Sequence, residues 1–251
     1  MRLMKQQLAA HFALVAFVVA VVTAMTRGVG MAAASGGTIA GHVRVNGKPS
    51  GNPVLRMGMD PACAAFTAGE RVPDQIVVVT PDGSLANVFA KLDGSFPQTP
   101  VPSQPVVVDQ RGCLYTPRVV GARVGQVLEF RNSDPVLHSV HSSTSHGNSF
   151  NFGQPLAGAK NSFRLKNEET MLHVTCDVHR WMNAYVGVVS HPYFAVSNRS
   201  GQFTIEHVPP GTYRLQLWHE RLGSTTQMVK VADSATTRVE AAFTPKEAAT
   251  K

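Results

Sequence analysis

Cysteine, clustered positive charge and helical periodicity are all scarce in this sequence of 251 residues. Lysine and arginine are spread along the chain without interleaved aromatic residues, so nothing in the charge pattern favours binding to nucleic acid. No segment combines sustained 3.6-residue periodicity with helix caps, which predicts few and short helices. The three cysteines include no Cys-x-x-Cys-His motif, which excludes covalent haem, and they are too few for an ordinary iron–sulfur cluster.

The N-terminal segment has the features of a secretory signal peptide. Two basic residues precede the apolar run Phe12 to Met25, and "MAAAS" follows with an Ala-x-Ala cleavage site after Ala34. An uncleaved membrane anchor is the alternative. About fourteen apolar residues make a helix of roughly 21 Å, which is short of a bilayer core of about 30 Å. We therefore expect residues 1–34 to be removed, leaving a periplasmic protein that begins at Ser35 and has no membrane contact.

The remainder of the chain is patterned for β-structure. Short alternating or β-branched segments, such as "TIAGHVRV" (38–45) and "AYVGVVS" (184–190), are separated by turn residues. Many short strands at regular spacing predict an all-β fold built from sandwiches or barrels. The polar stretch 142–160 predicts a long surface loop, which is either functional or a solvated connection.

A second pattern begins after residue 191. Phe203 and Ile205 alternate before a Pro-Pro-Gly turn, and Tyr213, Leu215 and Leu217 alternate after it, which predicts a hairpin with one buried face. This Gly-x-Phe strand followed by Pro-x-Gly-x-Tyr resembles the carboxypeptidase regulatory-like, transthyretin-type β-sandwich. The resemblance implies a structural or docking module at 192–251. "GTIAGHVRVNGKP" looks like the opening strand of such a module, so 35–74 is expected to join it, around a central domain at 75–191.

The heptapeptide "CDVHRWM" (176–182) places a thiol, an imidazole and a thioether at intervals of three residues. On a helix they would line one face and pack in a core. Strand-like segments flank the heptapeptide, however, and packing alone rarely places these three types in a loop. Thiolate, imidazole and thioether form a soft ligand set, and the methionine argues against zinc. A blue-copper electron-transfer centre needs this set together with a second histidine.

"FRNSDPVLHSVHS" (130–142) supplies that histidine from another strand, and "CDVHRWM" begins 38 residues after it. The two segments together resemble the cupredoxin family (plastocyanin, amicyanin, pseudoazurin), and the Cys-x-x-His-x-x-Met loop is similar to the shortest version in the amicyanin and pseudoazurin branch. The resemblance implies a Greek-key β-sandwich with one type 1 copper. His138, Cys176 and His179 would be the equatorial ligands and Met182 the axial ligand.

Two positions depart from the cupredoxin pattern. Ser139 and Asp177 stand where cupredoxins commonly have Asn after the first histidine and Ser or Thr after the cysteine. We expect a hydroxyl-to-carboxylate bond to tie the two loops instead, with the charge of Asp177 favouring oxidised copper. His141 is predicted to point to the opposite face of its strand, and His146 lies in the polar stretch. Both are expected to be solvated, and an accessory copper-loading site is the alternative.

The odd cysteine count of an exported chain also needs an explanation, because two of the three should pair in an oxidising compartment. With Cys176 assigned to the metal, Cys63 and Cys113 are predicted to form a disulfide.

The predicted function is that of a periplasmic one-electron carrier and not an enzyme, because the ligand set leaves no open coordination position. The expected partner is a redox protein, either a cytochrome c or a dehydrogenase. Electrons are expected to pass through His179, whose outer ring edge is predicted to reach the surface beside Val178 and Trp181. The alternatives are a copper-binding or storage protein without redox cycling, and a secreted structural β module. Similar two-part proteins are labelled methylamine-utilisation or plastocyanin-like.

Overall fold

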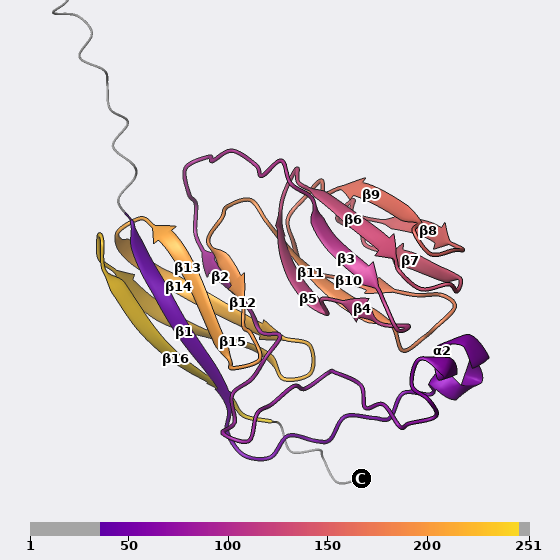
Figure 1. The fold of residues 1–251 in the computed structure, drawn as a ribbon. Coiled ribbons are helices and arrows are strands. Elements are labelled where there is room, and N and C mark those ends of the chain that lie inside the picture. Colours follow the sequence, from indigo (N-terminus) through magenta and orange to yellow (C-terminus); the bar gives the residue numbers. More distant parts are fainter. Residues whose placement is uncertain (1–35, 246–251) are drawn as a thin grey trace, which may run out of the picture. The chain divides into compact units, whose positions relative to one another are not determined.

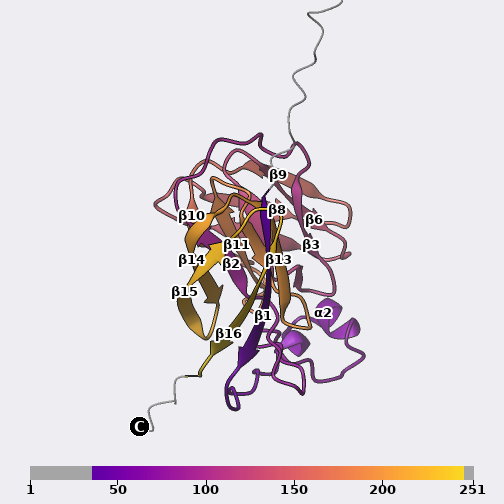
Figure 2. The same ribbon diagram turned by 90° about the vertical axis from the view of Figure 1, so that its left-hand side faces the viewer.

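The structure is a computed structural model that describes residues 36–245, so the predicted signal peptide and its cleavage site lie outside the described residues. Within this range the regular secondary structure is almost entirely β-strand (Figures 1 and 2). The helices are the 3-10 turn η1 (Met57–Met59) and the short helix α2 (Pro61–Ala65), which confirms that helices are few and short. Neither is long and apolar enough to cross a membrane.

Two sheets with a shared core form what we call the central sandwich. The first sheet has the order β5 (Val119–Arg123), β11 (Asn183–Val189), β10 (Glu169–Thr175), β7 (His138–Ser142), β8 (Phe150–Gln154). The second has the order β4 (Tyr115–Thr116), β3 (Val106–Gln110), β6 (Val127–Asn132), β9 (Lys160–Arg164). Apolar side chains from both sheets alternate inward and form one buried cluster, as the period-2 pattern of the strands predicts.

The other two sheets form what we call the terminal sandwich, with its own core. One has the order β13 (Gln202–Val208), β1 (Gly37–Val45), β16 (Thr236–Phe243). The other has the order β12 (Phe194–Val196), β2 (Phe89–Asp93), β14 (Gly211–His219), β15 (Gly223–Val231). The early strand β1 pairs antiparallel with β13 and parallel with β16. The domain boundaries expected from the sequence do not follow these two sandwiches. β2 lies inside the range 75–191 expected for the central domain, but it pairs with β12 and β14 of the terminal sandwich.

The predicted hairpin around the Pro-Pro-Gly turn is wrong in its pairing. β13 and β14 are adjacent in sequence, but they belong to opposite sheets of the terminal sandwich. Phe203 and Ile205 on β13 are buried in the same core as Leu215 and Leu217 on β14. The two prolines lack the N–H groups that would begin a ladder between the strands, so the turn crosses from one sheet to the other. β14 instead forms a hairpin with β15.

The polar stretch 142–160 is not a loop throughout, because β8 lies within it and pairs with β7. Phe150 on β8 is buried, and its ring packs against Phe130 and Phe163 with centroid separations of 5.4 and 5.1 Å. This strand follows from the alternation of Phe150 and Phe152, which the surrounding Gly, Ser and Asn residues obscure.

The two sandwiches contact each other at a small apolar cluster and a buried ion pair network. Phe89 packs so tightly on Gly187 that a Cβ there would lie 2.3 Å from its ring, so only glycine fits. Arg118, which directly precedes β5 of the central sandwich, donates hydrogen bonds to Asp74 (2.8 Å) and to Glu220 (2.5 Å). All three side chains are less than 9% exposed, so their charges compensate one another away from water.

Candidate metal centre

The predicted ligands are carried by three neighbouring strands of one sheet. His138 begins β7, Cys176 directly follows β10, and the loop from Cys176 leads through His179 and Met182 into β11. β10 pairs with both β7 and β11, so the ends of the three strands lie side by side. Positions that are distant in the sequence therefore meet at one end of the central sandwich, where these three inner strands begin or end.

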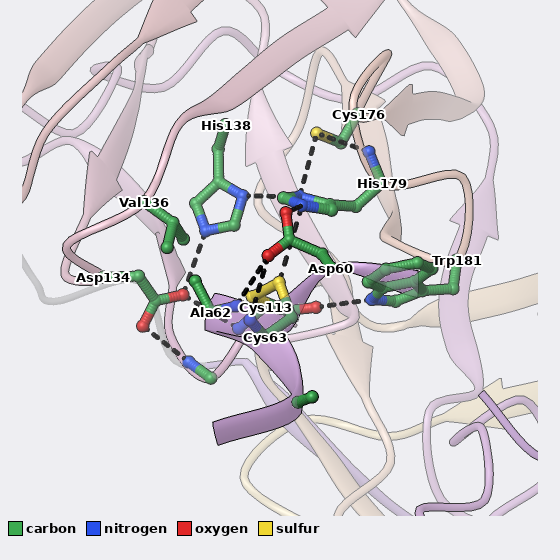
Figure 3. The surroundings of a disulfide bond; sticks show 12 residues. Asp60, Ala62, Cys63, Cys113, Asp134, Val136, His138, Cys176, His179 and Trp181 are labelled. Carbon is green, nitrogen blue, oxygen red and sulfur yellow. Dashed lines mark hydrogen bonds and ion pairs between the residues drawn. A yellow bond between two sulfur atoms is a disulfide. The ribbon is translucent and has the colours of Figure 1, made fainter. Parts of the chain in front are cut away.

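The three predicted equatorial donors converge in a buried site (Figure 3). The Nδ1 atoms of His138 and His179 are 3.0 Å apart, and the sulfur of Cys176 is 3.9 Å from Nδ1 of His179. The side chains of His138 and His179 are 0% and 2% exposed. Met182 is fully buried, and its backbone N–H donates to the carbonyl of His179 (2.9 Å), which closes the loop.

The sulfur of Cys176 lies in an environment that favours the thiolate. The backbone N–H groups of Ser139 and His179 both donate to it at 3.4 Å. Burial alone raises the pKa of the Cys176 thiol, but hydrogen bonding from His138 and from these N–H groups outweighs burial and lowers the pKa to about 6.

The two loops are tied together, although not by the predicted bond. The hydroxyl of Ser139 accepts from the backbone N–H of Asp177 (2.7 Å), so the expected hydroxyl-to-carboxylate bond is wrong. The carboxylate of Asp177 instead accepts from Nδ1 of His141 (2.9 Å) and from Asn151 (3.3 Å) at the surface. The hydrogen bond to His141 is the largest contribution to the lowered pKa of Asp177.

Each imidazole has a carboxylate on its outer nitrogen, which the sequence did not indicate. Nε2 of His138 is 3.0 Å from Asp134, and Nε2 of His179 is 3.0 Å from Asp60. A carboxylate accepts only from a protonated nitrogen, so both rings carry Nε2–H and turn Nδ1 towards the site. Asp134 follows a strand four residues before His138, and Asp60 stands before Pro61 like a helix N-cap. Neither pattern reveals the histidine partner.

His179 is covered by segment 46–74, which we call the cap, and the prediction that its outer edge reaches the surface is wrong. The disulfide between Cys63 and Cys113 is confirmed, and it anchors helix α2 of the cap to the central sandwich (Figure 3). The sulfur of Cys63 is 3.5 Å from Nε2 of His179. The free cysteine among the described residues is Cys176, as predicted.

The remaining histidines lie apart from this cluster. His146 has a 62% exposed side chain, as expected of a solvated residue. His141 is 36% exposed and bonded to Asp177, so it is partly shielded and not simply solvated. His173 is exposed, whereas His219 is fully buried in the terminal sandwich.

A cleft of about 570 Å³ opens beside the cap and reaches His179. Its wall combines apolar side chains with Arg56 and Arg180, which are both exposed. Trp181 borders the cleft, with its ring 5.0 Å from that of His179 and its Nε1–H donating to the carbonyl of Cys113 (3.0 Å). The cleft therefore offers a partly apolar surface beside the site.

The donor chemistry fits copper. A low-pKa thiol, two imidazoles whose Nδ1 atoms face the site and a buried thioether in the same loop are soft and borderline donors, and the thioether disfavours zinc. The two outer carboxylates complete the kind of hydrogen-bonded shell that surrounds histidine ligands in metalloproteins.

Comparisons with known proteins give partial similarities. The family described as polysaccharide lyase family 4, domain II, matches residues 166–239. No curated protein matches the chain. A Cu-containing nitrite reductase from Thermus scotoductus SA-01 is 20% identical at a TM-score of 0.30; the match covers 38% of this chain and only 24% of the reductase. A purple cupredoxin from Nitrosopumilus maritimus is 20% identical at a TM-score of 0.28, and the match covers 33% of this chain and 98% of that protein. A variant of amicyanin in its Cu(I) form is 18% identical at a TM-score of 0.30, and the match covers 39% of this chain and 97% of amicyanin.

Proposed function

We propose that this chain is a type 1 copper protein that carries single electrons between redox partners in the periplasm. One observation carries the proposal: two imidazole Nδ1 atoms and a thiol of lowered pKa converge in a buried site at the ends of three inner strands of one sheet. His138, Cys176 and His179 would hold the metal, with Met182 as a weak fourth donor. Bound copper supplies one-electron exchange between its two oxidation states.

The chain contributes a rigid, dry site. Two N–H groups hold the sulfur of Cys176, and the bond between Ser139 and Asp177 fixes one loop against the other. Outer carboxylates fix both imidazole tautomers, so the donors have little freedom to rearrange when charge changes. Burial of the donors excludes water as a competing ligand. This is the behaviour expected of a carrier and not of an enzyme.

The location and partner are part of the proposal. A buried disulfide suits an oxidising compartment, as does the signal peptide predicted from the sequence. The cleft beside Trp181 would receive the redox partner, a cytochrome c or a dehydrogenase. Arg56 and Arg180 on its wall favour an acidic contact surface on that partner, because Asp60 and Asp74 in the same cleft already pair with His179 and Arg118. The comparisons give no support to the methylamine-utilisation association.

Burial of His179 favours a second candidate function, copper storage without redox cycling. In this case the cap would protect the metal from exchange, and no partner would need to approach the ring. The disulfide and the carboxylate of Asp60 both hold the cap over His179, which slows loss of a bound metal.

The test is the optical spectrum and electrochemistry of the copper-loaded protein. An intense visible thiolate-to-copper band with a reversible one-electron couple is expected. Cys176→Ser should abolish the band, because the transition originates on the thiolate. Met182→Gln should keep copper bound but shift the band and the potential, because an axial contact tunes the site. His173→Gln, at an exposed position, is the matched control and should change neither.

The outcomes separate the candidates. A band without a reversible couple would favour storage. A protein that binds no copper would contradict both functions. A band that survives Cys176→Ser would contradict the ligand assignment itself.

A further inference from the structure

The carboxylate of Asp60 makes two kinds of contact through its two oxygens. Oδ1 accepts from the backbone N–H groups of Ala62 (2.8 Å) and Cys63 (3.3 Å), which caps helix α2. Oδ2 accepts from Nε2 of His179 (3.0 Å). One side chain therefore joins the start of the cap helix to the outer edge of a predicted metal ligand.

The surroundings of Asp60 restrict its movement away from the ring. Helix α2 is covalently anchored at Cys63, whose disulfide partner Cys113 is itself fixed by hydrogen bonds at both backbone polar groups. The N–H of Cys113 donates to Asp134 (2.8 Å), and its carbonyl accepts from Trp181 (3.0 Å). Asp60 is 119 residues from His179 in sequence, and this anchoring helps to hold the two together.

The two histidines are held by carboxylates of different origin (Figure 3). Asp134 belongs to the central sandwich, is almost fully buried, and directs its oxygens to the N–H groups of Gly112 and Cys113 as well as to His138. Asp60 comes from the cap, outside every sheet, and its side chain is 32% exposed. The orientation of His179 therefore depends on the cap, whereas that of His138 does not.

We propose that Asp60 is a positioning residue of the metal centre, an inference that rests on the proposed function. Its carboxylate holds the Nε2–H tautomer of His179 and so keeps the Nδ1 lone pair directed at the metal. A hydrogen-bonded carboxylate also makes the imidazole a stronger donor. A stronger donor favours Cu(II) over Cu(I), so Asp60 lowers the reduction potential.

Two substitutions separate this role from helix capping. Asn and Ser both cap helices nearly as well as Asp. Asp60→Asn keeps an oxygen for the cap but loses the negative charge beside His179, and Asp60→Ser keeps the cap with a side chain too short to bond the ring. Glu240→Gln is the matched control, because it removes a carboxylate that also contacts a histidine, His42, but lies in the terminal sandwich away from both ligand rings.

The first measurement uses metal-free protein, in which the 15N shifts of the ring report the tautomer of His179. For His179, the wild type and Glu240→Gln should show Nε2–H only, and both Asp60 variants should show a mixture. The second measurement is copper binding. Loss of an outer-shell partner typically weakens metal affinity by about 10–100-fold. A tenfold loss confined to Cu(II) would raise the one-electron potential by about 59 mV.

Unchanged tautomer and potential in both Asp60 variants would overturn the inference while leaving the copper carrier intact. A tautomer change without any shift in potential would also overturn it, because Asp60 would then be a structural contact only. If the wild type bound no copper, the proposed function would fail, and with it any role of Asp60 at a metal centre. The tautomer spectra would still show whether Asp60 holds the ring.

Discussion

Replacing Cys63 and Cys113 together by alanine should destabilise the protein and uncover His179. The two cysteines are 50 residues apart, and in the loop-entropy treatment a cross-link of this span stabilises the folded state by about 4 kcal/mol. The cap keeps other contacts, since Met57 is buried in the central core and Asp60 still bonds His179. We therefore expect a folded variant in which the cap opens locally and more often than in the wild type.

Urea unfolding of both metal-free proteins measures the first effect, as a difference in extrapolated free energy of unfolding. Acylation of histidines followed by peptide mass mapping measures the second. His179 should react slowly in the wild type and faster in the double variant, and the exposed His173 should react equally in both. A free-energy loss below about 1 kcal/mol, far from the loop-entropy value, would refute the view that the disulfide anchors the cap. Equal reactivity of His179 in the two proteins would refute the view that the cap shields it.

Two further predictions concern the terminal sandwich and its contact with the central one. Burial, with nearby arginine charge, lowers the pKa of His219 to about 4. The unfolded state, with an ordinary histidine pKa of about 6.5, binds the proton more tightly, so stability that is present above pH 6.5 is lost as the pH falls towards 4, by about 3 kcal/mol. Urea titrations at several pH values should show this loss in the wild type but not in His219→Asn, and parallel curves would disprove it. Arg118→Met should cost about 3–5 kcal/mol, because it leaves the carboxylates of Asp74 and Glu220 buried and unpaired. Arg111→Met, at an exposed ion pair, should cost less than about 1 kcal/mol, and similar losses for the two variants would show that the Arg118 network is not effectively buried.

The parts of the site that local sequence could predict are those held by one short loop. Cys176, His179 and Met182 are three residues apart, so their chemistry is visible without a fold. The disulfide followed from counting, because assigning one cysteine left only one possible pair. The assignment of His138 required the assumption that a second strand starts beside the loop. The pairing of β7 with β10 places His138, the first residue of β7, in that position.

The parts that could not be predicted depend on contacts between distant segments. Nothing in the sequence near Asp60 indicates that its carboxylate reaches a ring 119 residues away. The sequence also does not show that the cap covers His179, so its outer ring edge was predicted to be exposed. The same limit applies to β2, whose short apolar pattern fits either sandwich, since a strand's alternation specifies its buried face but not its neighbour. For the Pro-Pro-Gly turn, alternation on both sides predicted two inward faces correctly but did not show that they belong to opposite sheets.

The parallel pairing of β1 with β16 has a consequence for the order in which the protein folds. A chain is synthesised from its N-terminus, so β1 exists long before the strand that covers one of its edges. Until β16 is made, that edge is open, although β13 can already pair with the other edge of β1. Pairing between strands so far apart is slow to form, because a long loop must close first. The strands that carry His138, Cys176 and His179 all precede β16. The pocket for the metal, with the disulfide and Asp60 that hold its cap, can therefore assemble before the terminal sandwich is complete, and β16 is the strand that completes that sandwich.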